Sequence, residues 1–449
     1  MNFESEHEGN GFLEPGDSCI VKRSMLATKE EATPTVDQKQ HAAFFRQSGW
    51  LMMANISSGF MMLFVHFLNK IIPDYEYSAF VVLLMVVACL PNLPLQMVFA
   101  QQTARALEMG RQRQLAHMIR LSWLWTFILW AIAAALVCFY RQKIVAHWQL
   151  PNTACLLMML PMLLVSIWMP MFYGVQQGRQ DFFWIGWATI SNGALRLLGA
   201  AFLVMAFALG AAGMMAGALL GTAVAAGVGI WRNRDLLSLP AEKFDVRELL
   251  SQVVPLILGF GACQFLFTSD TMFAKAYFSG DAMKPYALAG TLSRALLWLV
   301  LPLATVMFPK IVQSTLHGKK SNLFGLAVLG TAILSTCGML GLWATGHIIV
   351  RIMGKASDVA GTTALIPWYA GAMIPLAMAN IMVNDLLARS RFAIVPLMIL
   401  IAVCYGMAMP YMLSHFPGRL EVPLQTVGVF NLLLFGVCAW FTWGKLEKR

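Results

Sequence analysis

Charged side chains are scarce in this chain of 449 residues. Asp, Glu, Lys and Arg make up 12% of the sequence, whereas 59% of the residues are hydrophobic. A soluble domain carries about 25% charged residues, because its surface must be hydrated. A soluble core cannot hide this much apolar surface, but a bilayer can. The composition therefore excludes an ordinary soluble protein and indicates a membrane protein.

The sequence also lacks the short motifs of common enzymes. It contains no HExxH, GxSxG or P-loop pattern, so zinc proteolysis, serine hydrolysis and ATP hydrolysis have no support. None of its eight cysteines forms a CxxC pair, and seven lie in or beside apolar runs. Such cysteines are expected to be small buried residues rather than metal or redox ligands. We therefore expect no metal, no cofactor and no enzymatic activity.

Long apolar runs make up most of the chain. Roughly 20 apolar residues span the hydrocarbon layer, and twelve runs approach that length. Lipid offers no partner for open backbone groups, so these runs should be helices; a barrel would need short alternating segments instead. The predicted spans are 48–69, 77–100, 116–139, 154–173, 182–208, 211–231, 249–274, 285–308, 322–345, 362–386, 392–413 and 424–443.

The second and eighth spans resemble each other. Residues 94–111 align without a gap on residues 302–319, and both copies share a Pro-Leu pair, a valine and a glycine followed by a basic residue. Paired halves with proline-broken spans are typical of secondary transporters. Other prolines within spans should also kink helices. The in-span prolines are Pro91, Pro94, Pro161, Pro170, Pro255, Pro302, Pro367, Pro375 and Pro396.

Four regions follow from these patterns. Residues 1–44 are polar, contain few aromatic residues and should form a disordered cytoplasmic tail. Residues 45–231 and 249–449 should each form a bundle of six helices, joined by a charged cytoplasmic linker at 232–248. No cleavable signal peptide is visible, so the first span is expected to act as an anchor, with translation starting at Met1 or Met25.

Basic residues predict the orientation of the chain. With the N-terminus inside, the inner segments hold 22 Lys and Arg residues and the outer segments hold eight. Basic residues concentrate on the cytoplasmic side of membrane proteins, so both termini are expected there. Contact with anionic membrane lipids also accounts for the net charge of +10, and no nucleic-acid partner is needed.

Polar side chains recur along one face of several predicted spans. Such groups are unfavourable in lipid, so each needs a partner, a cavity or a role. One interpretation is hydrogen bonding between neighbouring helices. The other is a shared wet interior, which the symmetric positions of the first and seventh spans favour. The stripes are Asn55, Gly59, Met62, His66 and Asn69; Gln264, Thr268, Thr271 and Lys275; Asn192 and Arg196; and Asn380 and Asn384.

Three charges lie deep within the predicted spans. Asp270 and Arg294 should reach similar depths, so an ion pair between them is one interpretation. Arg196 has no obvious acidic partner in any span. Arginine can grip a phosphate with two parallel hydrogen bonds, so a cationic chamber for a phosphate-bearing lipid head group is the other interpretation. The predicted substrate-binding residues are Arg196, Arg294, Lys275, Asn192, Gln264, Thr268 and Asn55.

A pair of acidic residues, Asp74 and Glu76, occupies the first outer loop. Membrane glycosyltransferases that use polyprenyl-phosphate sugars also place acidic residues in an early outer loop. Those enzymes usually have a large outer loop or domain, and this loop has about seven residues. A solvated turn is therefore the expected structure here.

Three motifs carry a resemblance to a known family. They are Gln264-Phe-Leu-Phe-Thr-Ser-Asp270, Tyr286-Ala-Leu-Ala-Gly-Thr-Leu-Ser-Arg294 and Leu301-Pro-Leu-Ala-Thr-Val-Met-Phe-Pro309-Lys310. They resemble the polysaccharide-transporter branch of the MOP flippase superfamily. That branch includes O-antigen flippases and is related to MATE drug exporters and lipid II flippases. The resemblance is clear over residues 250–315 and implies an all-α membrane protein, with twelve transmembrane helices in two pseudo-symmetric six-helix bundles.

The resemblance also implies a function. It implies movement of undecaprenyl-diphosphate-linked saccharides across a bacterial inner membrane by alternating access, with glycosyltransferases or a polymerase of polysaccharide biosynthesis as partners. Asp270 carries over as the acidic residue of the seventh span and Pro309 as the proline closing the eighth. The first span lacks the carboxylate of proton-coupled MATE exporters, so Asp270 or His66 is the candidate for binding a coupling proton. A cation-coupled multidrug exporter and a membrane glycosyltransferase are the alternatives.

Overall fold

The structure is a computed structural model that describes residues 36–240, 242, 246–278, 282–295, 323–388 and 391–444. The chain divides into two units, residues 1–46 and 47–449, and the contacts below lie within the second. Eleven segments of the described chain are long and apolar enough to cross a membrane. The helix at 282–295 begins the predicted eighth span. The rest of that span, with Pro302, Pro309 and the second copy of the repeat, lies outside the described residues.

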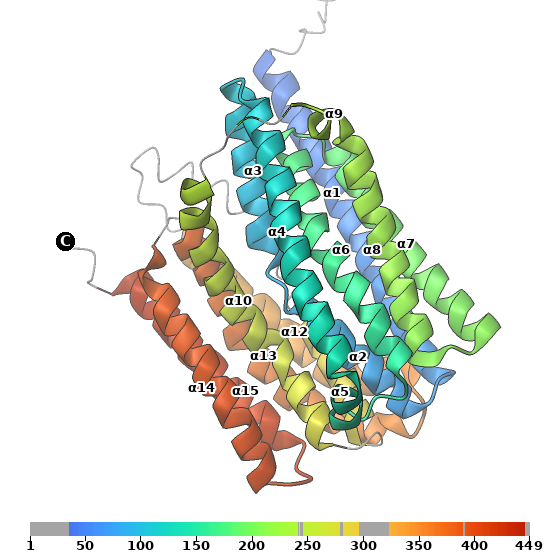
Figure 1. The fold of residues 1–449 in the computed structure, drawn as a ribbon. Helices are drawn as coiled ribbons and strands as arrows, with labels where there is room; N and C mark the ends of the chain where they lie inside the picture. The colour runs from blue at the N-terminus through green and yellow to red at the C-terminus, as the bar shows by residue number, and fades with distance from the viewer. Residues whose placement is uncertain are drawn as a thin grey trace, which may run out of the picture. The chain divides into compact units, whose positions relative to one another are not determined.

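The first bundle, called the N-lobe, packs α3 and α8 against α6 and α7 against α8 (Figure 1). A short helix lies at each end of it, α5 and α9. Its helices are α1 (Val36–Val65), the 3-10 helix η1 (His66–Lys70), α2 (Asp74–Ala88), α3 (Asn92–Glu108), α4 (Gln112–Phe139), α5 (Arg141–His147), α6 (Thr153–Gly178), α7 (Phe182–Phe207), α8 (Gly210–Arg232) and α9 (Arg234–Leu237).

The second bundle, called the C-lobe, packs α13 against α12 and α15, and α10 against α14. Its elements are α10 (Val246–Tyr277), the helical residues 282–295, α12 (Leu323–Met353), α13 (Asp358–Ala388), the 3-10 helix η2 (Phe392–Ile394), α14 (Val395–His415) and α15 (Glu421–Trp443). The predicted class, an all-α membrane protein of two helical bundles, is confirmed.

Several predicted boundaries differ from the structure. Helix α1 begins at Val36, so residues 36–44, predicted as part of a disordered tail, are helical. The connection expected at 346–361 shrinks to residues 354–357, because α12 continues to Met353 and α13 begins at Asp358. Hydropathy marks only the apolar centre of a helix, whereas these helices extend into polar residues at their ends.

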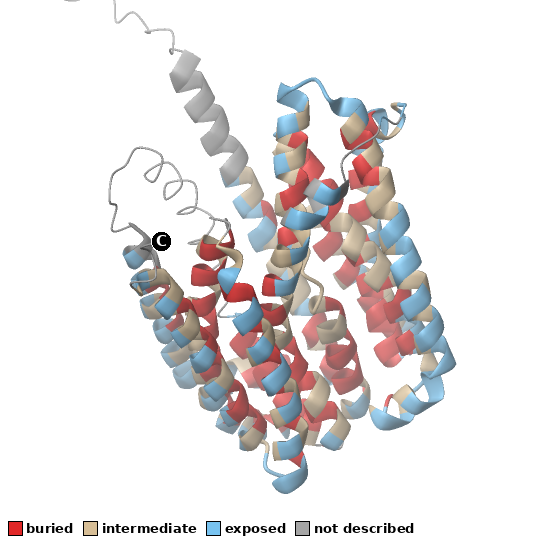
Figure 2. Cartoon of the chain, turned by 60° about the vertical axis from the view of Figure 1, so that its left-hand side comes forward, coloured by how far each residue is buried: buried red, intermediate tan, exposed pale blue. Residues whose placement is uncertain are grey.

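The outside of both lobes is apolar. Large hydrophobic side chains such as Leu129, Phe202 and Met407 are exposed. Figure 2 shows exposed residues on the outward faces of the helices and buried ones between helices. A surface of this kind suits contact with lipid. The exposed apolar residues are therefore consistent with a protein that crosses the membrane many times.

The second span is a broken helix. Pro91 has no N–H group, and α2 ends at Ala88 while α3 starts at Asn92. The N–H of Asn92, which would bond to the carbonyl of Ala88 in a continuous helix, bonds instead to the carbonyl of Leu90 at 2.9 Å. This break confirms the predicted effect of a proline at this position. Pro161, Pro170, Pro255, Pro367 and Pro375, by contrast, lie inside continuous helices.

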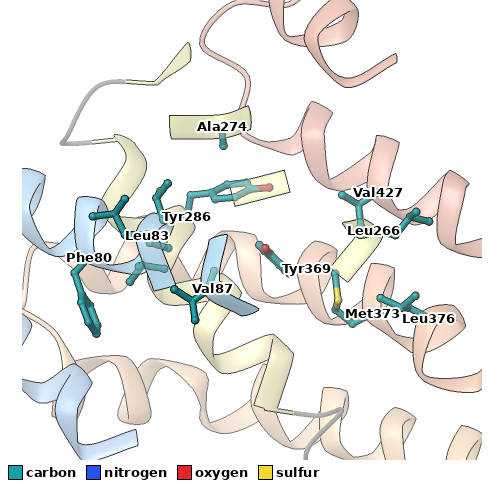
Figure 3. Close-up of a cluster of buried hydrophobic side chains, with 14 of the residues drawn as sticks. Phe80, Leu83, Val87, Leu266, Ala274, Tyr286, Tyr369, Met373, Leu376 and Val427 are labelled. Carbon is teal, nitrogen blue, oxygen red and sulfur yellow. The ribbon is translucent and has the colours of Figure 1, made fainter. Parts of the chain in front are cut away.

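One apolar core runs through both lobes. Phe80, Leu83 and Val87 of α2 belong to the same buried cluster as Leu266 of α10 and Tyr369 of α13 (Figure 3). Two smaller clusters, around Phe172 and Tyr173, lie within the N-lobe alone. Helix α2 therefore contributes to a core that the two lobes share, together with residues of α6, α7 and α8.

The segment between the lobes is docked on the N-lobe. Leu236 is buried beside α4 and α6, and the Arg120 guanidinium donates hydrogen bonds to the carbonyls of Leu237 and Leu239. Arg179 binds Asp235 at 2.8 Å, and this hydrogen bond lowers the pKa of the Asp235 carboxyl. Because this pair is largely exposed, it adds less than about 1 kcal/mol. The segment 233–240 marks one end of the spans, called here the linker end; the opposite end, where α2 begins, is called the Asp74 end.

Candidate functional site

An ion-pair cluster joins the two lobes at the Asp74 end. The ammonium group of Lys284 lies 2.9 Å from Oδ1 of Asp74 and 2.8 Å from Oδ2 of Asp358. The ammonium group of Lys355 lies 2.7 Å from the same Oδ1 of Asp74. We call these four residues the Asp74 cluster. Asp74 belongs to the N-lobe and the other three belong to the C-lobe, so the cluster holds the lobes together.

The acidic residues of the first loop are therefore not a solvated turn. Asp74 bridges the lobes, and the Glu76 carboxylate accepts the backbone N–H of Ala211 at 2.6 Å, in the first turn of α8. A carboxylate is favourable there because the first N–H groups of a helix lack partners. The sequence interpretation was wrong for both residues, because loop length alone does not show what packs against a loop.

Hydrogen bonds continue the junction from the Asp74 cluster toward the middle of the spans. The side-chain amide of Asn69 donates to the carbonyl of Met353 at 2.8 Å. The ammonium group of Lys275, fully buried, donates to Ser78 of α2 at 2.8 Å. Lys275 was predicted to line a chamber, but in this conformation it contacts the facing lobe.

The break in the second span is closed by the other lobe. The side-chain amide of Gln264 donates to the free carbonyl of Ala88 at 2.7 Å, and the hydroxyl of Thr268 lies 2.6 Å from the Cys89 sulfur. An open carbonyl is unfavourable inside a membrane, so Gln264 replaces the N–H of Asn92, which bonds to Leu90 at the break. Gln264, Thr268 and Lys275, three of the four residues of the predicted stripe, thus face the N-lobe. The fourth, Thr271, instead bonds to Arg294 within the C-lobe. We call the contacts from Asn69 to Cys89 with the C-lobe the seal.

A second group of buried charges lies within the C-lobe. Nη2 of Arg294 lies 2.5 Å from Oδ1 of Asp270 and 2.6 Å from the Thr271 hydroxyl. The hydroxyl of Tyr286 donates to Oδ2 of Asp270 at 2.9 Å, and the Tyr369 hydroxyl donates to the same oxygen. The ion pair that the depths of Asp270 and Arg294 predicted is present.

This pairing changes the role expected for both charges. The charge of Arg294 is balanced by Asp270, so Arg294 is not the free chamber cation that the sequence suggested. Asp270 in turn has four side-chain donors around it, from Arg294, Tyr286, Tyr369 and, at 3.4 Å, Thr271. Within a lobe, a buried pair of this kind is stable only while both members remain.

Arg196 stands apart from these pairs. It is buried in α7 with 7% of its surface exposed, and its Nη2 has no hydrogen-bond partner among the described residues. Among the described residues, no carboxylate lies within ion-pair distance of its guanidinium. Helix α8 packs closely against α7 at this point. A Cβ at Gly221 of α8 would lie 2.3 Å from the backbone carbonyl oxygen of Asn192 and 3.0 Å from the backbone nitrogen of Arg196. Arg196 is therefore a buried cation that its own lobe leaves unpaired.

Other polar atoms near Arg196 are also unpaired. Oδ1 of Asn192, one turn away, is buried without a partner among the described residues, as is the hydroxyl of Ser58. Ser58 belongs to α1 and lies against α7, because a Cβ at Gly193 would come within 2.7 Å of its hydroxyl. We call Ser58, Asn192 and Arg196 the Arg196 cluster. The predicted pair Asn192 and Arg196 thus gains a third member that the sequence did not indicate.

Two predicted residues of the first span lie elsewhere. Asn55 is exposed on α1 and does not join the Arg196 cluster. His66 is buried at the end of the same span, with Nδ1 at 2.9 Å from the Tyr77 hydroxyl. His66 is thus tied to α2, beside the seal.

Comparisons with known proteins place this architecture. No family model and no curated protein matches the chain. Among solved structures, an inward-facing multidrug resistance MATE family transporter of the MOP superfamily matches with a TM-score of 0.68 and 10% identity, covering 86% of this chain and 93% of that one. The chain has the fold of MOP-superfamily transporters.

Two further structures support this fold assignment. The lipid II flippase MurJ, in an inward closed conformation, matches with a TM-score of 0.64 and 13% identity over 87% of each chain. An outward-facing MATE family transporter matches with a TM-score of 0.58 and 13% identity, covering 90% of this chain and 95% of that one. The chain is therefore a multi-pass membrane protein whose architecture is that of transporters and flippases.

The sequence analysis missed several residues of the seal and of the C-lobe pair. Lys284 and Lys355 were counted only among the outer basic residues and Asp358 was not singled out, although all three are part of the Asp74 cluster. Tyr286 and Tyr369 were not singled out. A tyrosine inside an apolar span needs a partner for its hydroxyl. The position of these two tyrosines within spans could therefore have indicated that they contact a buried polar group.

The seal can be tested with the native cysteine at position 89. In a variant whose other cysteines are serine, Thr268→Cys should form a disulfide with Cys89 under mild oxidation, because the two side chains touch. The bond should stop transport until it is reduced. Leu258→Cys on the exposed face of α10 is the matched control and should not cross-link. Equal cross-linking of the two variants, or full transport by the cross-linked protein, would contradict the seal.

The pair in the C-lobe predicts a non-additive effect on stability. Arg294→Gln alone leaves a buried carboxylate without its cation and should lower the free energy of unfolding by about 3–5 kcal/mol. The double variant Asp270→Asn, Arg294→Gln should recover most of that loss, since neither charge remains. Thermal unfolding of the purified proteins measures both. A double variant as unstable as the single one would show that the pair is not the source of the effect.

Proposed function

We propose that this protein is a flippase that moves a lipid with a phosphate-bearing head group across the membrane by alternating access. The cargo class we favour is an undecaprenyl-diphosphate-linked saccharide of polysaccharide biosynthesis, in a bacterial inner membrane with both chain termini in the cytoplasm. Glycosyltransferases or a polymerase acting on the same lipid would be its partners. The observation that supports this proposal most is the unpaired Arg196.

The argument from Arg196 is one of charge balance. A buried guanidinium without a counter-ion is unfavourable by several kcal/mol, and polar groups inside a membrane protein usually face a partner or a substrate path. Asn192, one turn before it on α7, and Ser58, which lies against Gly193 of the same helix, add further unpaired polar atoms to this part of α7. A phosphate group carries two or more oxygens that a guanidinium can bind in parallel. An anionic head group is therefore the ligand that would complete the Arg196 cluster.

The pairing of the buried charges also distinguishes a flippase for anionic lipids from an exporter of cations. A cationic drug needs a carboxylate that is free to receive it. The buried carboxylates of the described residues, Asp270 and Asp358, each form an ion pair with a basic side chain. A MATE-like exporter remains the second candidate, because a MATE transporter gives a TM-score of 0.68. The charges favour the flippase.

The seal supplies the conformational side of the proposal. If basic residues mark the cytoplasmic side, the Asp74 end faces outward, and the seal closes the outside of the path. The match to an inward-facing MATE transporter supports the same assignment. Gln264, Thr268 and Lys275 would then line the path only after the lobes part at the Asp74 end.

Coupling to an ion requires a titratable group that can change its charge. Asp270 is a poor choice, because Arg294 already balances it. We assign coupling to His66 instead, as a group that takes up a proton only after the seal opens, since the sealed state buries it close to the positive charge of Arg196. In the sealed state Nδ1 of His66 bonds to the Tyr77 hydroxyl, and the direction of that hydrogen bond depends on the tautomer of the ring. Movement of α2 would break that hydrogen bond.

Flux in proteoliposomes tests the proposal. Arg196→Gln should lower the flux of a labelled undecaprenyl-diphosphate sugar by about tenfold or more, the worth of one charge-assisted hydrogen bond. Arg196→Lys should keep part of the flux, because the charge remains but the bidentate geometry is lost. Removal of an unpaired buried charge should leave the stability of Arg196→Gln unchanged or higher.

Two results would contradict the proposal. Unchanged lipid flux in Arg196→Gln would remove the role of Arg196. Transport of a cationic dye such as ethidium by the wild-type protein, without any lipid flux, would favour the exporter. Asn55→Gln is the matched control, since Asn55 is an exposed polar residue outside the Arg196 cluster and its replacement should not change the flux.

A further inference from the structure

The charges of the Asp74 cluster are divided unequally between the two lobes, and closing the seal does not require this. Lys284, Lys355 and Asp358 all belong to the C-lobe, and Asp74 is the one charged group of the N-lobe in the cluster; the Ile72 carbonyl, 3.4 Å from the Lys355 ammonium group, adds a neutral contact. When the lobes separate at this end, Asp74 must leave with the N-lobe. The C-lobe then keeps two ammonium groups and one carboxylate, which is a net charge of +1.

Asp358 is fixed within the C-lobe. Its Oδ2 accepts the backbone N–H of Lys355 at 2.8 Å as well as the ammonium group of Lys284 at 2.8 Å, and it is the first residue of α13. An acidic side chain in the first turn of a helix that reaches back to a backbone N–H three residues earlier fixes the entry of the chain into that helix. Asp358 therefore stays with the lysines as a structural counter-ion and does not move to balance the second positive charge.

Asp74 occupies the position of an exchangeable ligand. One oxygen, Oδ1, accepts both ammonium groups, at 2.9 Å from Lys284 and 2.7 Å from Lys355. A single anionic oxygen between two lysines is also how a phosphate oxygen can bind. Lys284 is fully buried in the sealed state, so the loss of Asp74 leaves a previously buried cation short of one counter-ion.

We propose that Lys284 and Lys355 form a phosphate-binding site on the C-lobe, which Asp74 fills when the lobes are sealed and an anionic ligand fills when they part. The ligand class is a phosphate or diphosphate, free or on a lipid head group. The identification of that ligand with the cargo rests on the proposed flippase function. A ligand that binds only the parted state shifts the equilibrium toward it, so the arriving head group would itself favour opening at the Asp74 end.

The rate of disulfide formation between Cys89 and Thr268→Cys reports the sealed state without using transport. Pyrophosphate added to the purified protein should lower this rate relative to sodium chloride at equal ionic strength, by at most about threefold at twice its dissociation constant for the parted state. Lys355→Gln should abolish the difference. Asp74→Asn should lower the rate without any added anion, since the amide loses its charge but keeps its shape.

Further measurements distinguish a lipid-linked phosphate from a free one. They also distinguish failure of this site from failure of the proposed flippase function. Undecaprenyl diphosphate in vesicles should act like pyrophosphate, whereas undecaprenol should not; a response to free pyrophosphate alone would assign the site to a soluble anion and overturn its identification with the cargo. Equal effects of pyrophosphate and chloride would show simple screening and overturn the site. The response should persist in Arg196→Gln, so failure of lipid flux and failure of this site give different results.

Discussion

Inside a bilayer, a polar group has no water to form hydrogen bonds with, so its partner must come from the protein. This constraint orders the whole structure. The carbonyl of Ala88, freed by Pro91, is bound by Gln264 of the other lobe. The buried Asp270 is bound by Arg294 and two tyrosines, and the buried Lys284 by two aspartates. Each of these contacts satisfies a buried polar group and holds its partner in place. The contacts of Gln264 with Ala88 and of Lys284 with Asp74 also join the two lobes.

The partners that cross between lobes differ in kind from those within a lobe. The pair Asp270 and Arg294 stays together whatever the lobes do, because both residues belong to the C-lobe. The bonds of Asp74, Asn69 and Gln264 exist only while the lobes meet. A transporter needs such reversible contacts, since each state must satisfy its polar groups in its own way. Water or cargo would replace these partners when the seal opens.

Arg196 is the exception, and it indicates what the protein binds. Each of the other buried charges named here has an ion-pair or hydrogen-bond partner in the protein, which for Lys275 is the neutral Ser78 hydroxyl, whereas Nη2 of Arg196 has none among the described residues. Proteins keep an unfavourable feature of this kind where it serves a function. An anionic head group would satisfy Arg196 from outside the protein, as the phosphate of the proposed second site would satisfy Lys284 and Lys355.

The sequence predicted the parts of this account that depend on periodicity and composition. The apolar runs located the spans, the stripe of Gln264, Thr268 and Lys275 identified one face of α10, and the depths of Asp270 and Arg294 predicted their pair. The Asp74 cluster could not be found in this way. Its members come from three connections that are distant in sequence, and only the packing of the lobes brings them together. The polar tyrosines were missed because aromatic residues count as apolar in a hydropathy pattern.

The central claim is that Arg196 receives an anionic head group, and equilibrium binding to the purified protein measures this most directly. Undecaprenyl diphosphate and undecaprenol differ only in the charged group, so the ratio of their affinities isolates its contribution. The account predicts that the diphosphate binds more tightly to the wild-type protein and that Arg196→Gln removes most of this preference. Equal affinity of the wild-type protein for the two lipids, or a preference that survives in Arg196→Gln, would contradict it.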